Sequence, residues 1–117
     1  NQLLQQARIE WHGVALHSPD WSENSHSLAF TVHGMQARFL LHGMLNAYWE
    51  PLTFELPRVP DESQQRWRRC VDTALVSPED FYTWEKAPSL AQTTYVVQPR
   101  SVVFLVLPLQ AEGEGLK

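Results

Sequence analysis

Histidines are the residues of this chain whose side chains could do the widest range of chemistry, and they are His12, His17, His26, His33 and His42. Imidazole nitrogens bind metals and exchange protons near neutral pH. Their spacing matches no His-x-x-x-His pair, and the single cysteine, Cys70, lies far beyond His42, so no zinc-ligand pattern is present. The sequence therefore predicts no metal site. We expect His33 and His42 at strand ends, with backbone or water partners.

Nucleophilic and acid–base catalysis find no recognisable site either. The Gly-x-Ser-x-Gly turn that presents a catalytic serine is absent. Thirteen Asp and Glu residues offer carboxylate pairs, which glycoside hydrolysis needs at a fixed separation. However, Glu10, Glu55 and Asp72 fall on the polar faces of predicted strands, and sequence cannot pair any two. We predict no catalytic residue and no cofactor for this chain by itself.

Tryptophan is the residue type here best suited to binding. Trp11 and Trp67 alternate with charged residues and are predicted to anchor the core, whereas Trp21, Trp49 and Trp84 fall in loops. An exposed loop tryptophan can stack on a sugar ring, be buried against another domain or fold back on its own domain. The three loop tryptophans are therefore the candidate substrate-binding residues, with all three alternatives open.

Composition excludes several classes of partner. With 44% hydrophobic residues, 19% charged residues and five tryptophans, the 117-residue chain is typical of one globular domain with a packed core. A net charge of −4 argues against a nucleic-acid or anionic-membrane partner, and the longest apolar run, Val102–Leu107, is too short to cross a bilayer. The single cysteine and the lack of an Asn-x-Ser/Thr sequon favour a cytoplasmic location.

Short β-like runs alternate with turn-rich gaps along the chain, at residues 8–11, 27–33, 38–47, 52–56, 67–73, 94–97 and 101–107. They predict an all-β, antiparallel sandwich of about six to eight strands. We expect a hairpin connection at Asn46–Pro51, paired strands at 94–97 and 101–107, and a short helix that starts at Ser77-Pro78 and ends before Pro88. In the first run, Ile9 and Trp11 share one face.

The last predicted strand departs from simple alternation. Val102–Leu107 is apolar at every position, so both of its faces need cover. Either loops of the same domain shield a central strand, or its outer face docks on a neighbouring domain. The second alternative predicts an exposed apolar patch in this chain.

A set of segments in fixed order resembles a known family. Its members are Ile9–Gly13, Pro19–Ser22, Ser27–Phe30, Leu45–Pro57, Trp67 with Val71–Thr73, Tyr95–Val97 and Arg100–Val103. Together they resemble the C-terminal domain of isoamylase-type glycogen debranching enzymes, which belong to the α-amylase superfamily, glycoside hydrolase family thirteen. The resemblance implies a Greek-key β-sandwich of the α-amylase C-terminal type, packed on a catalytic (β/α)₈ barrel that hydrolyses α-1,6 branches of glycogen.

The resemblance also implies how this chain is organised. The catalytic Asp, Glu and Asp of that family lie in the barrel, so no catalytic residue transfers to this sequence. We expect residues 1–7 to be the remnant of an interdomain connection, 8–109 the sandwich domain and 110–117 a flexible tail. The implied role is a non-catalytic accessory domain that packs on and stabilises the barrel of the same polypeptide. The alternative is a module that binds glycogen or another branched α-glucan on surface aromatics.

Overall fold

Seven β-strands form the protein in the computed structural model, which describes residues 7–21, 25–34, 39–59, 66–83 and 85–108. The strands are β1 (Ala7–His12), β2 (Ser27–Gly34), β3 (Phe39–Asn46), β4 (Leu52–Glu55), β5 (Arg68–Asp72), β6 (Thr94–Val97) and β7 (Ser101–Pro108). Every pairing is antiparallel, and the described residues contain no helix. The predicted all-β sandwich is confirmed. Residues 1–6, Trp84 and the predicted tail lie outside the described residues.

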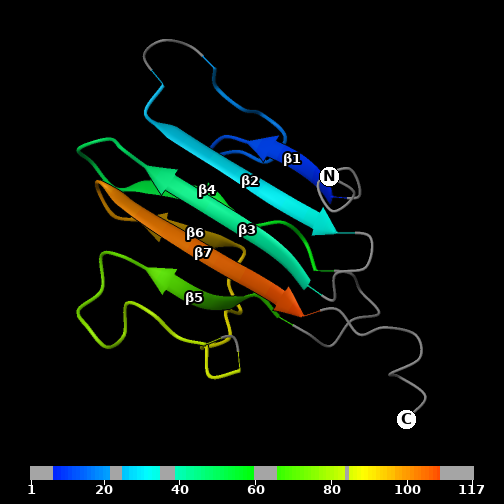
Figure 1. The fold of residues 1–117 in the computed structure, drawn as a ribbon. Coiled ribbons are helices and arrows are strands. Elements are labelled where there is room, and N and C mark those ends of the chain that lie inside the picture. The colour runs from blue at the N-terminus through cyan, green and yellow to red at the C-terminus, as the bar shows by residue number, and fades with distance from the viewer. Residues whose placement is uncertain (1–6, 22–24, 35–38, 60–65, 84, 109–117) are drawn as a thin grey trace.

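The strands form two sheets of unequal width. The large sheet has the order β1-β2-β3-β7-β5, and the small sheet consists of β4 and β6. Figure 1 views the large sheet from outside, with β4 and β6 behind it. Strand β6 lies against β3 and β7. The small sheet therefore covers the middle of the large sheet, and loops cover the remainder of its inner side.

The core fills the space between the two sheets. In the large sheet, β7 has the inward residues Val103, Leu105 and Leu107, and all three are fully buried. The small sheet contributes Phe54 and Val97, which are also fully buried. Period-two alternation explains why every second residue of β7 faces this core. The other residues of β7, Val102, Phe104 and Val106, face outward and are half-buried.

Two predicted pairings are wrong. Residues Asn46–Pro51 do not form a hairpin, because β3 already pairs with β2 and β7 and the chain crosses to the other sheet to form β4. Strands β6 and β7 also lie in different sheets. Short connections between apolar runs resemble hairpins in sequence, but a sandwich uses them to change layers.

The predicted helix after Ser77 is also wrong. The segment runs along the edge of β5 instead: the Asp72 amide donates to the Asp80 carbonyl at 3.0 Å, and the Tyr82 amide donates to the Cys70 carbonyl at 2.8 Å. An isolated bridge joins Val71 to Phe81. Backbone pairing with the sheet edge replaces the pairing a short helix would make, so tertiary context overrides the local helix-start signal.

A buried asparagine joins the two sheets at one end. Asn46, the last residue of β3, donates through Nδ2 to the carbonyl oxygens of Glu50 and Val97 at 2.9 Å and of Gln98 at 3.2 Å. Its Oδ1 accepts from the Tyr48 amide at 2.8 Å. One side chain thus fixes the chain path from β3 into the next loop and ties that loop to the end of β6.

Candidate functional site

The outer face of the large sheet is apolar on four adjacent strands. Its side chains are Ile9 and Trp11 of β1, Leu28, Phe30 and Val32 of β2, Leu41 and Leu45 of β3, and Val102, Phe104 and Val106 of β7. Each is half-buried or exposed. The prediction that Trp11 anchors the core is therefore wrong, because its side chain is 43% exposed on this face. Trp67, by contrast, is buried as predicted and donates from Nε1 to the Pro57 carbonyl at 2.9 Å.

An aromatic row crosses the centre of this face. Trp11, Phe30, Gly43 and Phe104 are register partners on successive strands. Ring centroids are 6.0 Å apart for Trp11 and Phe30 and 6.3 Å apart for Phe30 and Phe104. The two phenylalanines meet above Gly43, where an added Cβ would lie 2.6 Å from Phe30 Cζ. Trp21 extends the row, with its ring edge-on to Trp11 at 5.6 Å.

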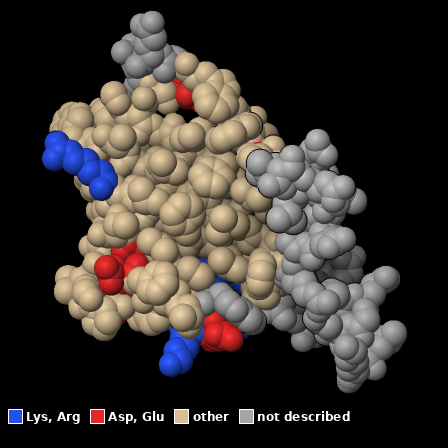
Figure 2. Space-filling model, in the orientation of Figure 1, with Lys and Arg blue, Asp and Glu red and all other residues tan. Residues whose placement is uncertain are grey.

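Charged side chains are absent from the middle of this face. Figure 2 shows the described Lys, Arg, Asp and Glu residues at its margins, with an uncharged surface between them. Four strands at about 4.8 Å spacing and five residues along each give a patch on the order of 300 Å² in plan. Contiguous apolar patches of this size on a folded domain are often interaction sites. We call the ten apolar side chains and Trp21 the apolar face.

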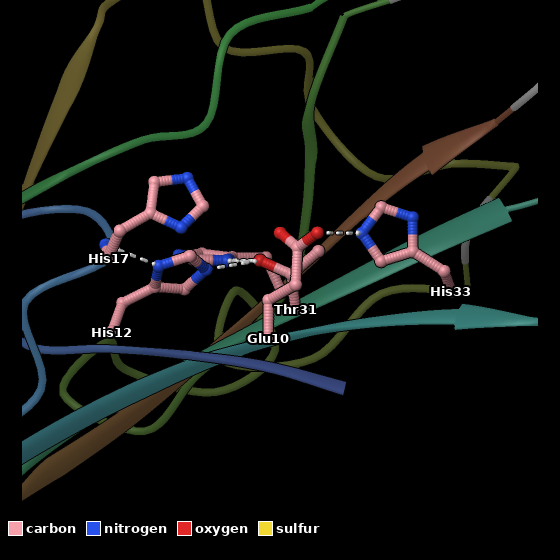
Figure 3. Close-up of polar contacts among 6 residues, drawn as sticks. Glu10, His12, His17, Thr31 and His33 are labelled. Atoms are coloured by element: carbon pink, nitrogen blue, oxygen red, sulfur yellow. Dashed lines mark hydrogen bonds and ion pairs between the residues drawn. The ribbon is translucent and has the colours of Figure 1, made fainter. Parts of the chain in front are cut away.

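The opposite side of β1 and β2 is polar, which reverses the usual arrangement of a sandwich sheet. His12, Thr31 and His42, from β1, β2 and β3, are all buried there. Figure 3 shows His12 and Thr31 with Glu10, His17 and His33. His42 lies in the middle of β3, so its predicted position at a strand end is wrong, whereas His33 is next to the last residue of β2.

Hydrogen bonds join the three buried residues in a row, and each residue donates to the next, from His12 through Thr31 to His42. The His17 amide donates to His12 Nδ1 at 2.8 Å, so that nitrogen accepts and the ring proton of His12 resides on Nε2. His12 Nε2 then donates to Thr31 Oγ1 at 2.9 Å, and the Thr31 hydroxyl donates to His42 Nδ1 at 2.9 Å. Both histidines are therefore neutral Nε2–H tautomers. The His42 ring lies against Trp67, with centroids 5.7 Å apart.

Burial keeps these histidines neutral. It lowers the pKa of His42 to about 3, and the neighbouring His12 contributes in the same direction. Burial also lowers the pKa of His12, with His17 adding to that effect and Glu10 opposing it. At the edge of the cluster His33 Nε2 lies 3.5 Å from Glu10 Oε2. An imidazole held neutral by burial cannot serve as a general acid near pH 7.

Metal binding has no site in the part of the chain that the structure describes. No three of its His, Cys, Asp or Glu residues are placed to hold one metal ion. The buried carboxylate Asp72 accepts from the Tyr95 hydroxyl and from the Ala74 amide, and burial together with this bond raises the pKa of Tyr95. These groups join β5 to β6 structurally. No helix in the described ranges is long and apolar enough to cross a membrane.

The structure describes two of the three predicted substrate-binding tryptophans. Trp21 is 65% exposed beside the apolar face, and Trp49 is 64% exposed in the loop after β3, where its ring lies 5.4 Å from that of Tyr48. Trp84 lies outside the described residues. The docking alternative for Val102–Leu107 included Phe104, because an apolar run requires cover on both faces. Sequence reasoning missed Phe30 of β2 as a surface residue.

Comparison with known proteins relates this chain to part of longer proteins. The profile of the family described as "Isoamylase 1-3, C-terminal" matches residues 10–107, from within β1 to within β7. This chain belongs to that family. Among curated relatives, "Isoamylase SU1, chloroplastic" of Zea mays is 35% identical over 88 residues, which are 75% of this chain and 10% of that protein.

Two further isoamylases give the same result. "Isoamylase 1, chloroplastic" of Oryza sativa subsp. japonica is 36% identical over 76 residues, and its Arabidopsis thaliana counterpart is 30% identical over 76 residues. Each match covers 65% of this chain and 9% of the relative. This isoamylase C-terminal domain thus spans about a tenth of the length of the curated relatives it matches.

Proposed function

We propose that this chain is a non-catalytic accessory domain that packs through its apolar face on the catalytic region of the same polypeptide. The parent protein would be a debranching hydrolase that cleaves α-1,6 branch linkages in glycogen or a related α-glucan. The observation that carries the proposal is the apolar, charge-free outer face of the large sheet in a chain whose family occupies a small C-terminal part of much longer isoamylases.

The occupant of the face follows from length and chemistry. The relatives carry about nine tenths of their sequence outside the matched segment, so their preceding region is the nearest available surface. A face with no charge in its middle favours an apolar partner, because a charged one would lose hydration without gaining an ion pair. At ~25 cal/mol per Å², covering on the order of 300 Å² contributes roughly 7 kcal/mol before the cost of ordering the contact.

The test places the same new charge on each of two valines. Val102 of β7 points outward from the large sheet, and Val96 of β6 is 46% exposed on the small sheet. In the longer protein encoded by the reading frame that contains this sequence, we expect Val102→Glu to lower the melting temperature and accelerate loss of debranching activity on heating. We expect Val96→Glu to leave both near wild type.

Three results would contradict the proposal. One is a reading frame without a hydrolase region. The second is a Val102→Glu parent protein that is as stable as the Val96→Glu protein. The third is release of linear chains from amylopectin by the purified 117-residue chain, which would show that the chain is catalytic by itself.

A further inference from the structure

A second group of aromatic rings lies in loops at one end of the sandwich, where two rings are exposed and the middle one is half-buried. His26 precedes β2, and Tyr48 and Trp49 follow β3. The Ala47 amide donates to the His26 carbonyl at 2.8 Å, so the two segments are side by side. The His26 and Tyr48 rings are stacked, 5.3 Å apart at 19°, and Trp49 lies 5.4 Å from Tyr48 at 48°. We call these three residues the aromatic ledge.

The backbone that carries the ledge is held in place before any ligand arrives. Asn46 accepts from the Tyr48 amide and donates to the Glu50 carbonyl, so the two ends of the Tyr48–Glu50 turn are fixed by one buried side chain. Rings on a fixed loop lose little conformational entropy when they bind a ligand. Apolar packing within the domain does not require this arrangement, because Trp49 remains 64% exposed and His26 is also exposed.

The chemistry of the ledge suits a neutral, hydroxyl-rich ligand. Flat rings offer apolar faces to the C–H faces of a pyranose, and their polar edges, together with the exposed Glu50, offer hydrogen-bond groups to its hydroxyls. Glu50 and the net charge of −4 disfavour phosphates and nucleic acids. The His26 and Tyr48 rings stack on each other, so the ledge offers their edges and outer faces together with the tilted Trp49 ring. Three rings in succession can contact more than one sugar of a chain.

We propose that His26, Tyr48 and Trp49 form a surface binding site for a chain of α-1,4-linked glucose units, at the end of the sandwich where β2 begins and β3 ends. The identity of the sugar rests on the proposed function, since a debranching hydrolase acts on such chains. The site would hold the polymer on the accessory domain and so raise its concentration near the catalytic region.

The experiment compares two tryptophans of equal exposure. The 117-residue chain is run in native gels that contain glycogen, with gels that contain dextran as the control polymer. We expect glycogen to retard the wild type and Trp21→Ala equally. We expect Trp49→Ala to bind at least about tenfold more weakly, the factor that corresponds to loss of one ring contact of ~1.4 kcal/mol. Dextran retards none of them.

Further variants keep the test decisive. His26→Ala removes an exposed ring at the end of the ledge without altering the backbone hydrogen bond of that residue, and we expect it to weaken retardation by glycogen. Trp49→Phe retains a ring, and we expect it to be retarded more than Trp49→Ala. Val102→Glu should bind glycogen as the wild type does, because Val102 is not part of the aromatic ledge. Glycogen binding therefore tests the ledge independently of whether the apolar face packs on the catalytic region. Absence of retardation in the wild type, or equal loss in Trp21→Ala and Trp49→Ala, overturns the site.

Discussion

Single residues reverse the expected polarity of the large sheet. His12, Thr31 and His42 occupy inward positions that apolar residues usually fill, and Trp11 and Phe30 occupy outward ones. The bonds between these groups remove part of the cost of burial, and His42 Nε2 is buried without a hydrogen-bond partner among the described residues. Because of this arrangement the core contains neutral imidazoles. The apolar side chains of β1 and β2 point outward, where another surface could cover them.

The neutral state of His42 predicts an acid-sensitive fold. The pKa of His42 is about 3 in the folded protein against an ordinary 6.5. Between these two pH values His42 is therefore protonated in the unfolded chain and neutral in the folded chain. Stability is therefore complete above pH 6.5 and falls with decreasing pH, by up to about 1.4 kcal/mol per pH unit for this residue. His12 acts in the same direction. Urea unfolding at pH 7, 5.5 and 4.5 measures the effect.

The matched variant for this measurement is His42→Gln, which retains polar atoms but does not titrate. We expect it to be less stable at pH 7 and to show a shallower dependence of unfolding free energy on pH than the wild type. Equal slopes for the two proteins would mean that His42 does not cause the acid sensitivity.

At the scale of elements, strand positions are predictable from this sequence and strand partners are not. Thr94–Val97 appears in the structure with its predicted bounds, because β-branched and aromatic runs bounded by Pro or polar residues are a local signal. The partner of that strand is Leu52–Glu55, about forty residues away in sequence, and no local signal specifies it. The lost helix after Ser77 also reflects tertiary pairing, since Val71 at the edge of β5 bridges to Phe81 in that segment.

The connection between the sheets gives a second prediction. Asn46→Ala leaves the carbonyls of Glu50, Val97 and Gln98 and the Tyr48 amide without their shared partner. We expect it to cost about 3 kcal/mol in the free energy of unfolding, measured by urea denaturation. Because the same side chain fixes the aromatic ledge, glycogen retardation should weaken with it.

Thr53→Ala, on the exposed side of β4, serves as the control and should stay within about 0.5 kcal/mol of wild type. An Asn46→Ala protein as stable as the Thr53→Ala protein would show that water replaces these bonds at no cost.

At the scale of the whole molecule, the two sheets differ in width, and the strands differ in how well they are protected from solvent. Strands β3 and β7 are central in the large sheet and lie under β6, whereas β1 is at its edge and has an exposed outer face. We expect amide hydrogen exchange to be slowest in β3 and β7 and markedly faster in β1. Exchange of the 117-residue chain followed by NMR provides the measurement. Uniform protection across all strands would show that the sandwich opens only as one unit.

The candidate sites were partly predictable at this scale. The apolar run of β7 indicated that something must cover its second face, and the loop tryptophans indicated exposed aromatics. Which side of β1 and β2 would face the core was not predictable, because Ile9 and Trp11 alternate with Glu10 and His12 as in any half-buried strand. Only the three-dimensional arrangement shows that the polar side is the buried one.

The reversed polarity of β1 also bears on how the strand finds its place. Sliding β1 by one residue against β2 would turn Ile9 and Trp11 inward and Glu10 and His12 outward, an exchange that hydrophobicity favours when nothing covers the outer surface. In the folded chain the bond from His12 to Thr31 opposes that error. A neighbouring domain that covers the apolar face would oppose it further, because only the correct register places Ile9 and Trp11 against that domain. The domain would then select the register of this edge strand as well as stabilise the fold.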